Sequence, residues 1–535
     1  MSGKTLAALL GILALAIFLR FWDLRSTPPG LYPDEAMNGN NGVEALAGEG
    51  FRVFYPDNNG REGLFINIQA LSVKYFGNEP WALRLVSGIF GVLTVWGIFL
   101  LTRNLFYSEA HRDRLALLAS FFLATGLWHI NFSRIGFRAI MAPFFLVWGL
   151  YFFFKFYNDI GSPQKQMLQA AAGGLLFGLG FHSYIAYRIA PILLALPIIA
   201  GWNKPRRETC FPCLSLIFIL FMAMAIIPLA LYFLDNPSDF LGRTSQISIF
   251  TQASPLKALA VNIAKTAGMF WVYGDPNWRH NFSASPELPL ILGVFFLVGL
   301  VTALKNISRF NNLFLLAMLD VVLLPVVISS EGLPHALRSI IAIPPVMILS
   351  ALGAYTIFTK MRDWLSSQTT RYPQYTHQLG RIKKEIGLLG AVLLLALAVN
   401  SYDTYFNRWA PRTEVYAAFN ARDWEMAMYL KNLPNDLDKY IVITGERIDP
   451  RIVTISSQAV LFGTNTFLTE ERERKNFHYL SPEELEKSIT TNPYRWVEIV
   501  FLGEENKQLA SALLKKYPNM QMRPEGSFIV LALSP

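Results

Sequence analysis

Charged residues and cysteine are both scarce in this chain. Of its 535 residues, 16% are charged and 53% are hydrophobic, whereas a soluble domain carries about 25% charged residues. This deficit, together with many long apolar runs, excludes an ordinary soluble domain and predicts a polytopic membrane protein. The two cysteines, Cys210 and Cys213, open an apolar run, and no thioredoxin-like pattern surrounds them. We therefore expect neither a structural disulfide framework nor redox chemistry.

Several catalytic signatures are also missing from the sequence. It contains no glycine-rich phosphate loop, no GxSxG nucleophile turn and no HExxH zinc motif. The net charge of +9 is explained by basic loops on one side of a membrane, so we expect no nucleic acid among the partners.

Long apolar runs set the predicted fold. A helix needs about 20 mainly apolar residues to cross a bilayer, and residues 1–402 hold enough runs for about eleven transmembrane helices. The predicted spans are residues 6–21, 83–101, 115–130, 139–156, 168–181, 189–202, 214–234, 288–303, 313–329, 339–358 and 386–400. Residues 65–76 form a shorter apolar stretch, which we expect at the membrane interface.

Basic residues gather in the connections that follow even-numbered spans. They are Arg103, Arg112, Arg114, Lys204, Arg206, Arg207, Lys305, Arg309, Lys360, Arg362, Arg381, Lys383 and Lys384. The positive-inside rule places these connections in the cytoplasm. We therefore expect a multi-pass protein of the plasma or inner membrane with a cytoplasmic N-terminus. The first outer loop, residues 23–82, then lies on the other side with everything after residue 402.

The last part of the chain, residues 403–535, is richer in charge and has shorter apolar runs. Residues 440–444, 496–502 and 528–533 have strand patterns, and residues 419–432 and 504–516 have helical ones. Alternating strands and helices predict a small C-terminal α/β domain outside the membrane.

The first outer loop carries the most informative acidic residues. Asp34 and Glu35 are adjacent, and Glu62 follows Arg61 further along the loop. Carboxylates next to a membrane are costly to desolvate and are commonly functional. The structural alternative is that Asp34 caps a short helix beginning near Ala36.

Three further polar groups are expected on the same side of the membrane. The segment 271–281 combines aromatic residues with Asp275, Arg279, His280 and Asn281, as a sugar site would require. An interfacial aromatic belt would not need these polar residues together. His335 and Arg338 precede the tenth span, and Arg138 follows the third. The arginines suit a phosphate at the membrane surface, but snorkelling explains them equally simply.

These groups suggest displacement at a sugar carbon. A carboxylate would take the proton from an acceptor hydroxyl, and arginines would stabilise a departing phosphate. Nucleotide sugars are scarce outside the cytoplasm, so a sugar carried on a lipid phosphate is the expected donor.

At these residues the chain resembles the GT-C superfamily of membrane glycosyltransferases. It looks most like the branch holding the dolichyl-phosphate-mannose–protein mannosyltransferases and the lipid A aminoarabinose transferase. The matching pieces are PDEA at 33–36, REGLF at 61–65, ALRLVSGIFG at 82–91, SRIGFRAI at 133–140 and PHALRSIIAIPP at 334–345. The likeness covers roughly the first 400 residues.

The resemblance implies inverting transfer from a polyprenyl-phosphate sugar, of undecaprenyl or dolichyl type, on the outer face of the membrane. The acceptor would be a protein, a lipid or an envelope glycan. Asp34, Glu35 and Glu62 are then the catalytic candidates, with Asp34 and Glu62 as ligands if a divalent metal is used. Arg338, Arg61, Arg138 and Arg279 are the candidates for the donor phosphate. Asp275, His280, Asn281 and His335 are those for the substrate.

A transporter or flippase of lipid-linked glycans is the alternative function. It would favour charged groups at mid-membrane and two related halves. The acidic groups instead cluster in loops, Asp320 is one of few mid-span charges, and the halves are unlike.

The predicted sidedness can be tested by labelling with an impermeant thiol reagent in a cysteine-free background. A cysteine replacing Ser511 should label in intact cells, since the C-terminal domain is expected outside. A cysteine replacing Ser367 should label only after lysis. The reverse pattern would refute the predicted topology.

Overall fold

The structure is a computed structural model that describes residues 1–204, 208–240, 248–330, 332–443, 454–491, 496–502 and 507–533. Arg206 and Arg207, used above to orient the chain, lie outside the described residues. Contacts divide the chain into two compact units. The transmembrane unit comprises Met1–Trp22, Ser87–Arg134 and Arg138–Trp409, and the loop-and-tail unit comprises Asp23–Val86, Ile135–Phe137 and Ala410–Pro535.

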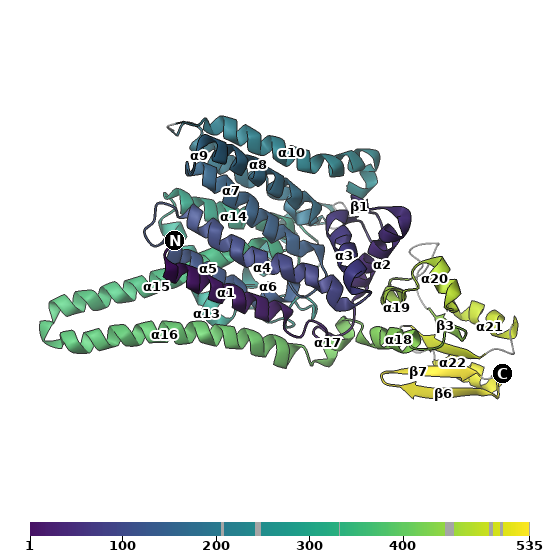
Figure 1. Cartoon of the computed structure of the whole chain (residues 1–535). Coiled ribbons are helices and arrows are strands. Elements are labelled where there is room, and N and C mark those ends of the chain that lie inside the picture. Colours follow the sequence, from purple (N-terminus) through teal and green to yellow (C-terminus); the bar gives the residue numbers. More distant parts are fainter. Residues whose placement is uncertain are drawn as a thin grey trace. The chain divides into compact units, whose positions relative to one another are not determined.

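The transmembrane unit consists mainly of helices, and it includes the greater part of α4 (Figure 1). They are α1 (Gly3–Phe21), α4 (Pro80–Leu105), α5 (Arg112–Thr125), α6 (Leu127–Phe132), α7 (Met141–Tyr157), α8 (Pro163–Leu179), α9 (Ile192–Gly201), α10 (Phe211–Asp235), α12 (Pro255–Gly268), α13 (Leu290–Lys305), α14 (Phe310–Val327), α15 (Ile343–Arg371) and α16 (Thr376–Tyr402). The long helices α15 and α16 form a hairpin that extends beyond the neighbouring helices of this unit.

Each of the eleven predicted spans coincides mainly with helical residues, which confirms the polytopic helical fold. Among the described residues, six helices are long and apolar enough to cross a membrane by length and composition. They are α1, α4, α10, α14, and α7 and α15 with the short turns before them. The predicted span 115–130 is interrupted, because α5 ends at Thr125 and α6 begins at Leu127, with Gly126 between them in an extended conformation.

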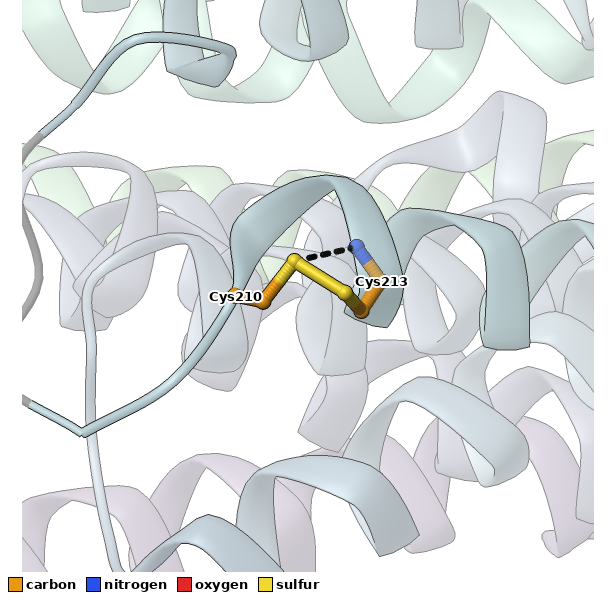
Figure 2. Close-up of a disulfide and its surroundings, with 2 residues drawn as sticks. All are labelled: Cys210 and Cys213. Carbon is orange, nitrogen blue, oxygen red and sulfur yellow. Dashed lines mark hydrogen bonds between the residues drawn. A yellow bond between two sulfur atoms is a disulfide. The ribbon is translucent and has the colours of Figure 1, made fainter.

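The two cysteines, for which we expected neither a disulfide framework nor redox chemistry, form one local disulfide. Cys210 and Cys213 form a disulfide at the start of α10 (Figure 2). The first turn of a helix brings residues i and i+3 together, and the two Cα atoms are 5.2 Å apart, within the range that a disulfide spans. A single bridge of this kind closes one helical turn and does not staple distant parts of the fold.

The loop-and-tail unit joins the first outer loop to the C-terminal residues. Its elements are α2 (Pro33–Glu44), β1 (Phe54–Tyr55), β2 (Arg61–Glu62), α3 (Gly63–Phe76), α17 (Thr413–Ala418), α18 (Ala421–Lys431), β3 (Asp438–Val442), α19 (Gln458–Thr464), α20 (Thr469–Arg474), β4 (Phe477–Leu480), α21 (Pro482–Thr491), β5 (Val497–Phe501), α22 (Lys507–Lys516), β6 (Met520–Glu525) and β7 (Phe528–Leu533). The division at residue 402 stays a prediction, since contacts group loop and tail together.

The tail residues form the predicted α/β arrangement. The strand order is β4-β3-β5-β7-β6, with β3 parallel to β4 and β5, and β7 antiparallel to β5 and β6. Apolar side chains of the central strands pack on one face with α21 and α22, through Leu485 and Leu513, and on the other with α18, through Met426. Ser481 and Glu484 form a reciprocal capping box at the start of α21.

Helix α2 belongs to the first outer loop and packs against the C-terminal residues of this unit. Buried Ala36 of α2 and Leu31 share an apolar cluster with Ala459 and Phe462 of α19. Asn40 of α2 also donates a hydrogen bond to the Gln458 carbonyl at 3.0 Å. The tail therefore supports the helix that carries the acidic pair of the first loop.

Candidate functional site

The acidic pair begins α2, but its two members have different surroundings. Glu35 is fully buried and paired with Arg84 of α4, whose Nε and Nη2 donate to the carboxylate at 3.0 and 3.1 Å. The amide of Gly136 donates to the same carboxylate at 2.6 Å. A carboxylate held this way orients the helix start, and it is not exposed to a substrate.

Arg84 extends this network to the chain entering α2. Its Nη1 donates to the Pro28 carbonyl at 2.6 Å, and its Nη2 donates to the Gly30 carbonyl at 2.8 Å. Gly30 has φ of 62° and lies against the Ala421 backbone, where a Cβ would not fit. The turn into α2 therefore requires glycine.

Asp34 is the partly exposed member of the pair. It is the second residue of α2, which begins at Pro33, so the helix starts before Asp34 and not near Ala36. Its Oδ1 accepts a hydrogen bond from Asn58 at 2.8 Å. Asp34 is thus an accessible carboxylate on a backbone fixed by its neighbour Glu35.

Arg61 and Glu62 form the short strand β2 and are both buried. Arg61 donates from Nη1 to Asn38 at 2.7 Å and from Nη2 to Asn41 at 2.6 Å, and both amides belong to α2. These contacts make Arg61 a brace for α2. Its predicted contact with a donor phosphate stays a prediction, as does a catalytic role for Glu62.

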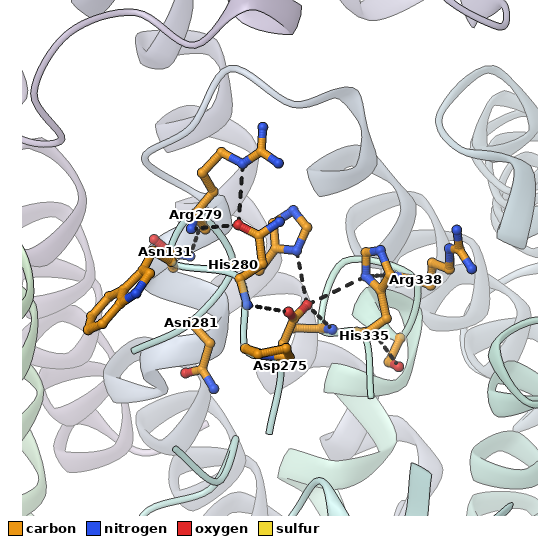
Figure 3. A network of polar contacts seen from close by, with 12 residues as sticks. Asn131, Asp275, Arg279, His280, Asn281, His335 and Arg338 are labelled. Atoms are coloured by element: carbon orange, nitrogen blue, oxygen red, sulfur yellow. Dashed lines mark hydrogen bonds and ion pairs between the residues drawn. The ribbon is translucent and has the colours of Figure 1, made fainter. Parts of the chain in front are cut away.

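A second polar group lies in the transmembrane unit and centres on Asp275 (Figure 3). The Oδ1 of Asp275 accepts from the Asn277 amide at 2.8 Å. Its Oδ2 is 2.9 Å from His280 Nδ1, and it accepts from the Ala336 amide at 2.8 Å. The His335 Nδ1 is 3.5 Å from the same Oδ2. Asp275 therefore ties the loop after α12 to the turn before α15.

Two carboxyl groups of this loop are shifted in opposite directions. Burial acts to raise the pKa of Asp275, but the hydrogen bond from His280 and the charges of both histidines hold that pKa below its usual value. Burial raises the pKa of Glu287 well above its usual value. The hydrogen bond from the Asp275 amide opposes this shift, and the charge of the Asp275 carboxylate adds to it. Glu287 accepts from the Asp275 amide at 3.0 Å and was not predicted from the sequence.

The two arginines of this group extend away from Asp275 (Figure 3). Arg338 donates to the Ser329 hydroxyl. Arg279 is held by Asn277, which accepts from both its amide, at 3.0 Å, and its Nε, at 3.3 Å. Arg138 lies elsewhere in the unit, with its guanidinium 5.9 Å from the ring centre of Tyr184.

Helix α6 holds both segments of the group in place. Asn131 donates to the Arg279 carbonyl at 2.6 Å, and Trp128 donates to the Ala336 carbonyl at 3.0 Å. Asn281, predicted to bind substrate, is buried and donates to the Ser285 carbonyl at 2.5 Å. No sequence pattern pointed to Trp128 and Asn131, because they lie within an apolar run and their partners are distant in sequence.

The three side chains around Asp275 are a second candidate set of metal ligands, beside the predicted Asp34 and Glu62. In the described part of the chain, Asp275, His280 and His335 form a group whose potential ligand atoms lie within 4.8 Å of one another. Asp34 and Glu62 are not part of that group. A metal on Asp34 and Glu62 therefore stays a prediction from the resemblance.

Comparisons with known proteins agree with this architecture. Residues 64–232 match the family described as dolichyl-phosphate-mannose-protein mannosyltransferase. The structure is similar to the crystal structure of ArnT from Cupriavidus metallidurans bound to undecaprenyl phosphate, with a TM-score of 0.57 and 13% identity. That match covers 99% of this chain and 98% of the other. No curated protein matches the sequence.

An archaeal enzyme has a related fold. The oligosaccharyltransferase AglB from Archaeoglobus fulgidus, in complex with an inhibitory peptide and a dolichol-phosphate, matches with a TM-score of 0.50 and 16% identity. The match covers 93% of this chain and 69% of the other. The predicted GT-C fold is therefore confirmed.

The Glu35–Arg84 pair makes a testable contribution to stability. Replacing Arg84 by alanine would leave a buried carboxylate without its cation, which costs about 3–5 kcal/mol. We therefore expect Arg84→Ala to lower the thermal unfolding midpoint of the detergent-purified protein strongly.

Arg103→Ala is the matched control on the same helix. Arg103 pairs with Asp113 at 2.6 Å, but both side chains are more than a quarter exposed. Loss of such a pair costs about 1 kcal/mol or less. Equal shifts in the two variants would contradict a special role for the Arg84 pair.

Proposed function

Starting from a chain with the GT-C glycosyltransferase fold, we propose that this protein is a membrane glycosyltransferase that uses a polyprenyl-phosphate sugar as donor. It transfers the sugar to an acceptor hydroxyl at the outer face of the membrane. The observation that carries this proposal is Asp34, a partly exposed carboxylate on a fixed helix start. The resemblance to the ArnT and AglB folds supports the choice of donor.

Asp34 acts as the general base in this proposal. The acceptor hydroxyl loses its proton to the Asp34 carboxylate as its oxygen attacks the anomeric carbon of the sugar. The bond between that carbon and the phosphate oxygen breaks, and the polyprenyl phosphate leaves with the bonding electrons. Glu35 positions Asp34 through its pair with Arg84 and does not touch the substrate.

Arg338 neutralises the departing phosphate. A planar guanidinium can donate two parallel hydrogen bonds to phosphate oxygens, which an ammonium group cannot do. Arg338 lies in the turn just before α15, and Asp275 holds that turn through the Ala336 amide. The negative charge that builds up on the phosphate during transfer makes this contact strongest in the transition state.

The acceptor is a protein, a lipid or an envelope glycan that presents a hydroxyl to the outer face. The N-terminus is cytoplasmic and the C-terminal residues are outside in this proposal, as the basic connections between spans indicate. The protein therefore belongs to the plasma or inner membrane.

The role of Asp34 can be tested by Asp34→Asn, which keeps the size of the side chain and removes its basicity. We expect turnover to fall about 10²-fold or more, as for loss of a general base. The measurement is transfer of radiolabelled sugar from polyprenyl-phosphate donors to envelope fractions by the purified protein.

Asp57→Asn is the control, because Asp57 is a partly exposed acid of the same loop that contacts Asn41 of α2. It should transfer at nearly the wild-type rate. Near wild-type turnover by Asp34→Asn would remove Asp34 from the mechanism. Absence of transfer by the wild-type protein with every donor would count against the proposed function itself.

The role of Arg338 can be tested by Arg338→Lys, which keeps the charge. Loss of the paired hydrogen bonds to phosphate should reduce kcat/KM for the donor about tenfold or more, with part of the loss in kcat. A residue that only snorkels would tolerate lysine. If both kinetic parameters stay at wild-type values, the phosphate contact passes to Arg279 or Arg138.

A further inference from the structure

We propose that a cavity between α5, α15 and α16 binds the headgroup of an anionic glycerophospholipid. The cavity has a volume of about 430 Å³ and lies wholly within the transmembrane unit, and its size is typical of a ligand pocket. Its lining residues belong neither to the Asp34 region nor to the Asp275 group. The proposal does not depend on the proposed function, because lipid binding can be measured without any transfer reaction.

The charge of the cavity is the first argument. Three cations line it, one from each helix: Arg114 of α5, Arg362 of α15 and Lys383 of α16. None of the described residues that line it is acidic. Cations gathered without an acid repel one another, and an anion placed among them relieves that repulsion. The cavity therefore favours a negatively charged ligand.

The contacts of these cations leave their charges available to a ligand. Arg362 lies 3.3 Å from Asp363, but the two side chains are 49% and 68% exposed, and a surface pair of this kind is worth little. Lys383 donates to the Ser366 hydroxyl at 3.3 Å, which is a neutral acceptor. Arg114 is exposed at the start of α5.

The order of lining residues along the helices is the second argument. On α5, Arg114 precedes the apolar Leu117 by about one turn. On α15, which runs the opposite way, Arg362 follows Phe358 by about one turn, and on α16 Lys383 precedes Gly387 by one turn. Each cation therefore lies nearer to the basic connections, and a residue without charge lies deeper among the helices.

Two glycines of α16 shape the cavity. Gly390 lets α16 approach α15 closely, because a Cβ at this position would lie 2.9 Å from the Phe358 ring. Gly387 lies one turn nearer to the connection and lines the cavity. No atom from elsewhere in the described chain lies within 4 Å of the place that a Cβ of Gly387 would take. The helices thus meet at Gly390 and leave open space beside Gly387.

The surroundings favour a phospholipid over a soluble anion. Helix α16 continues past the cavity with exposed apolar side chains, among them Leu388, Leu389, Val392 and Leu395, as expected of a helix in contact with acyl chains. The connection between α15 and α16 is expected in the cytoplasm, and the cytoplasmic leaflet carries anionic lipids. A phospholipid satisfies the cations with its phosphate and the apolar surface with its acyl chains, whereas a soluble phosphate satisfies the cations alone.

A lipid bound here would join three helices. Its phosphate would lie among side chains of α5, α15 and α16, which otherwise carry like charges. Helices α15 and α16 form the long hairpin that extends beyond its neighbours (Figure 1). The lipid would therefore hold this hairpin against α5 and stabilise the folded protein.

The test measures lipid binding by the full-length protein in non-ionic detergent after removal of bound lipid. The protein is titrated separately with phosphatidylglycerol, phosphatidylcholine and inorganic phosphate. Native mass spectrometry counts the bound lipid, and the thermal unfolding midpoint reports stabilisation. We expect about one tightly bound phosphatidylglycerol per chain with a raised midpoint, at least about tenfold weaker binding of phosphatidylcholine, and no midpoint shift with inorganic phosphate at the same concentration.

The combined variant Arg114→Gln, Arg362→Gln and Lys383→Gln removes the three cations of the cavity. Each lysine or arginine beside an anionic lipid contributes about fivefold in affinity. We therefore expect affinity for phosphatidylglycerol to fall on the order of 10²-fold.

The matched control removes the same amount of charge from exposed cations of α15 and α16 that do not line the cavity. It combines Lys360→Gln, Arg381→Gln and Lys384→Gln. This control should bind phosphatidylglycerol nearly as the wild type does, because its cations do not surround the phosphate.

A steric variant tests the same site without changing charge. Gly387→Leu should lower affinity for phosphatidylglycerol at least about tenfold, because its side chain fills the space beside α16 and displaces the lipid. That space is open in the protein, so the variant should fold. Gly380→Leu is the control, since Gly380 lies on the same helix, has equally open surroundings and does not line the cavity.

Three results would overturn the proposal. One is equal affinity of the wild-type protein for phosphatidylglycerol and phosphatidylcholine. Another is equal affinity for phosphatidylglycerol in the cavity variants and their controls. The third is a midpoint shift with inorganic phosphate as large as that with phosphatidylglycerol, which would indicate a site for a soluble anion. A protein that binds lipid here but transfers no sugar would retain the lipid site and reject the proposed function.

Discussion

The buried ion pair between Glu35 and Arg84 is the constraint on which the acidic end of α2 depends. Arg84 satisfies both oxygens of Glu35 and the carbonyls of Pro28 and Gly30 at once. Burying two charges is costly unless every hydrogen-bonding group is satisfied. The network meets that condition and fixes the chain as it enters the helix, which leaves the adjacent Asp34 partly exposed in a defined position.

The loop-and-tail unit adds a second level of support to α2. Arg61 braces the helix from the loop side through Asn38 and Asn41. From the tail side, α19 packs on the helix and bonds Asn40. The C-terminal residues therefore have a structural role, since they cover the helix that carries the proposed base.

The same principle organises the polar group of the transmembrane unit. Asp275 accepts hydrogen bonds from two backbone amides and contacts two histidines, so one carboxylate fixes a loop and a turn together. Arg279 and Arg338 extend from these fixed segments. In both units, a buried carboxylate holds the backbone next to a polar side chain that is a candidate for the chemistry.

The sequence predicted the helical spans well, because apolar runs of membrane length have few alternative explanations. It also identified Asp275, His280 and His335 as polar residues in outer segments, and the structure brings these three together. The sequence did not show which side chains contact one another. Glu35 and Asp34 are adjacent acidic residues, and only the structure shows that Arg84 pairs with Glu35. Likewise, only the structure shows that Arg61 donates to two amide side chains of α2.

Contacts between residues far apart in sequence explain most of the remaining differences. Arg84 was part of an apolar helix pattern, and nothing local linked it to residue 35. Trp128 and Asn131 were likewise hidden in an apolar run, although they hold the segments on either side of the Asp275 group. The disulfide differs in being local, and its spacing was visible in the sequence.

The central claim is that sugar transfer occurs by a single displacement with Asp34 as base. The most direct measurement is the anomeric configuration of the product, determined by nuclear magnetic resonance with a donor of known configuration, together with the amount of polyprenyl phosphate released. The account predicts inversion at the anomeric carbon and one polyprenyl phosphate per sugar transferred, because one bond forms as the other breaks. Retention of configuration would contradict it, since retention requires a second displacement through an intermediate.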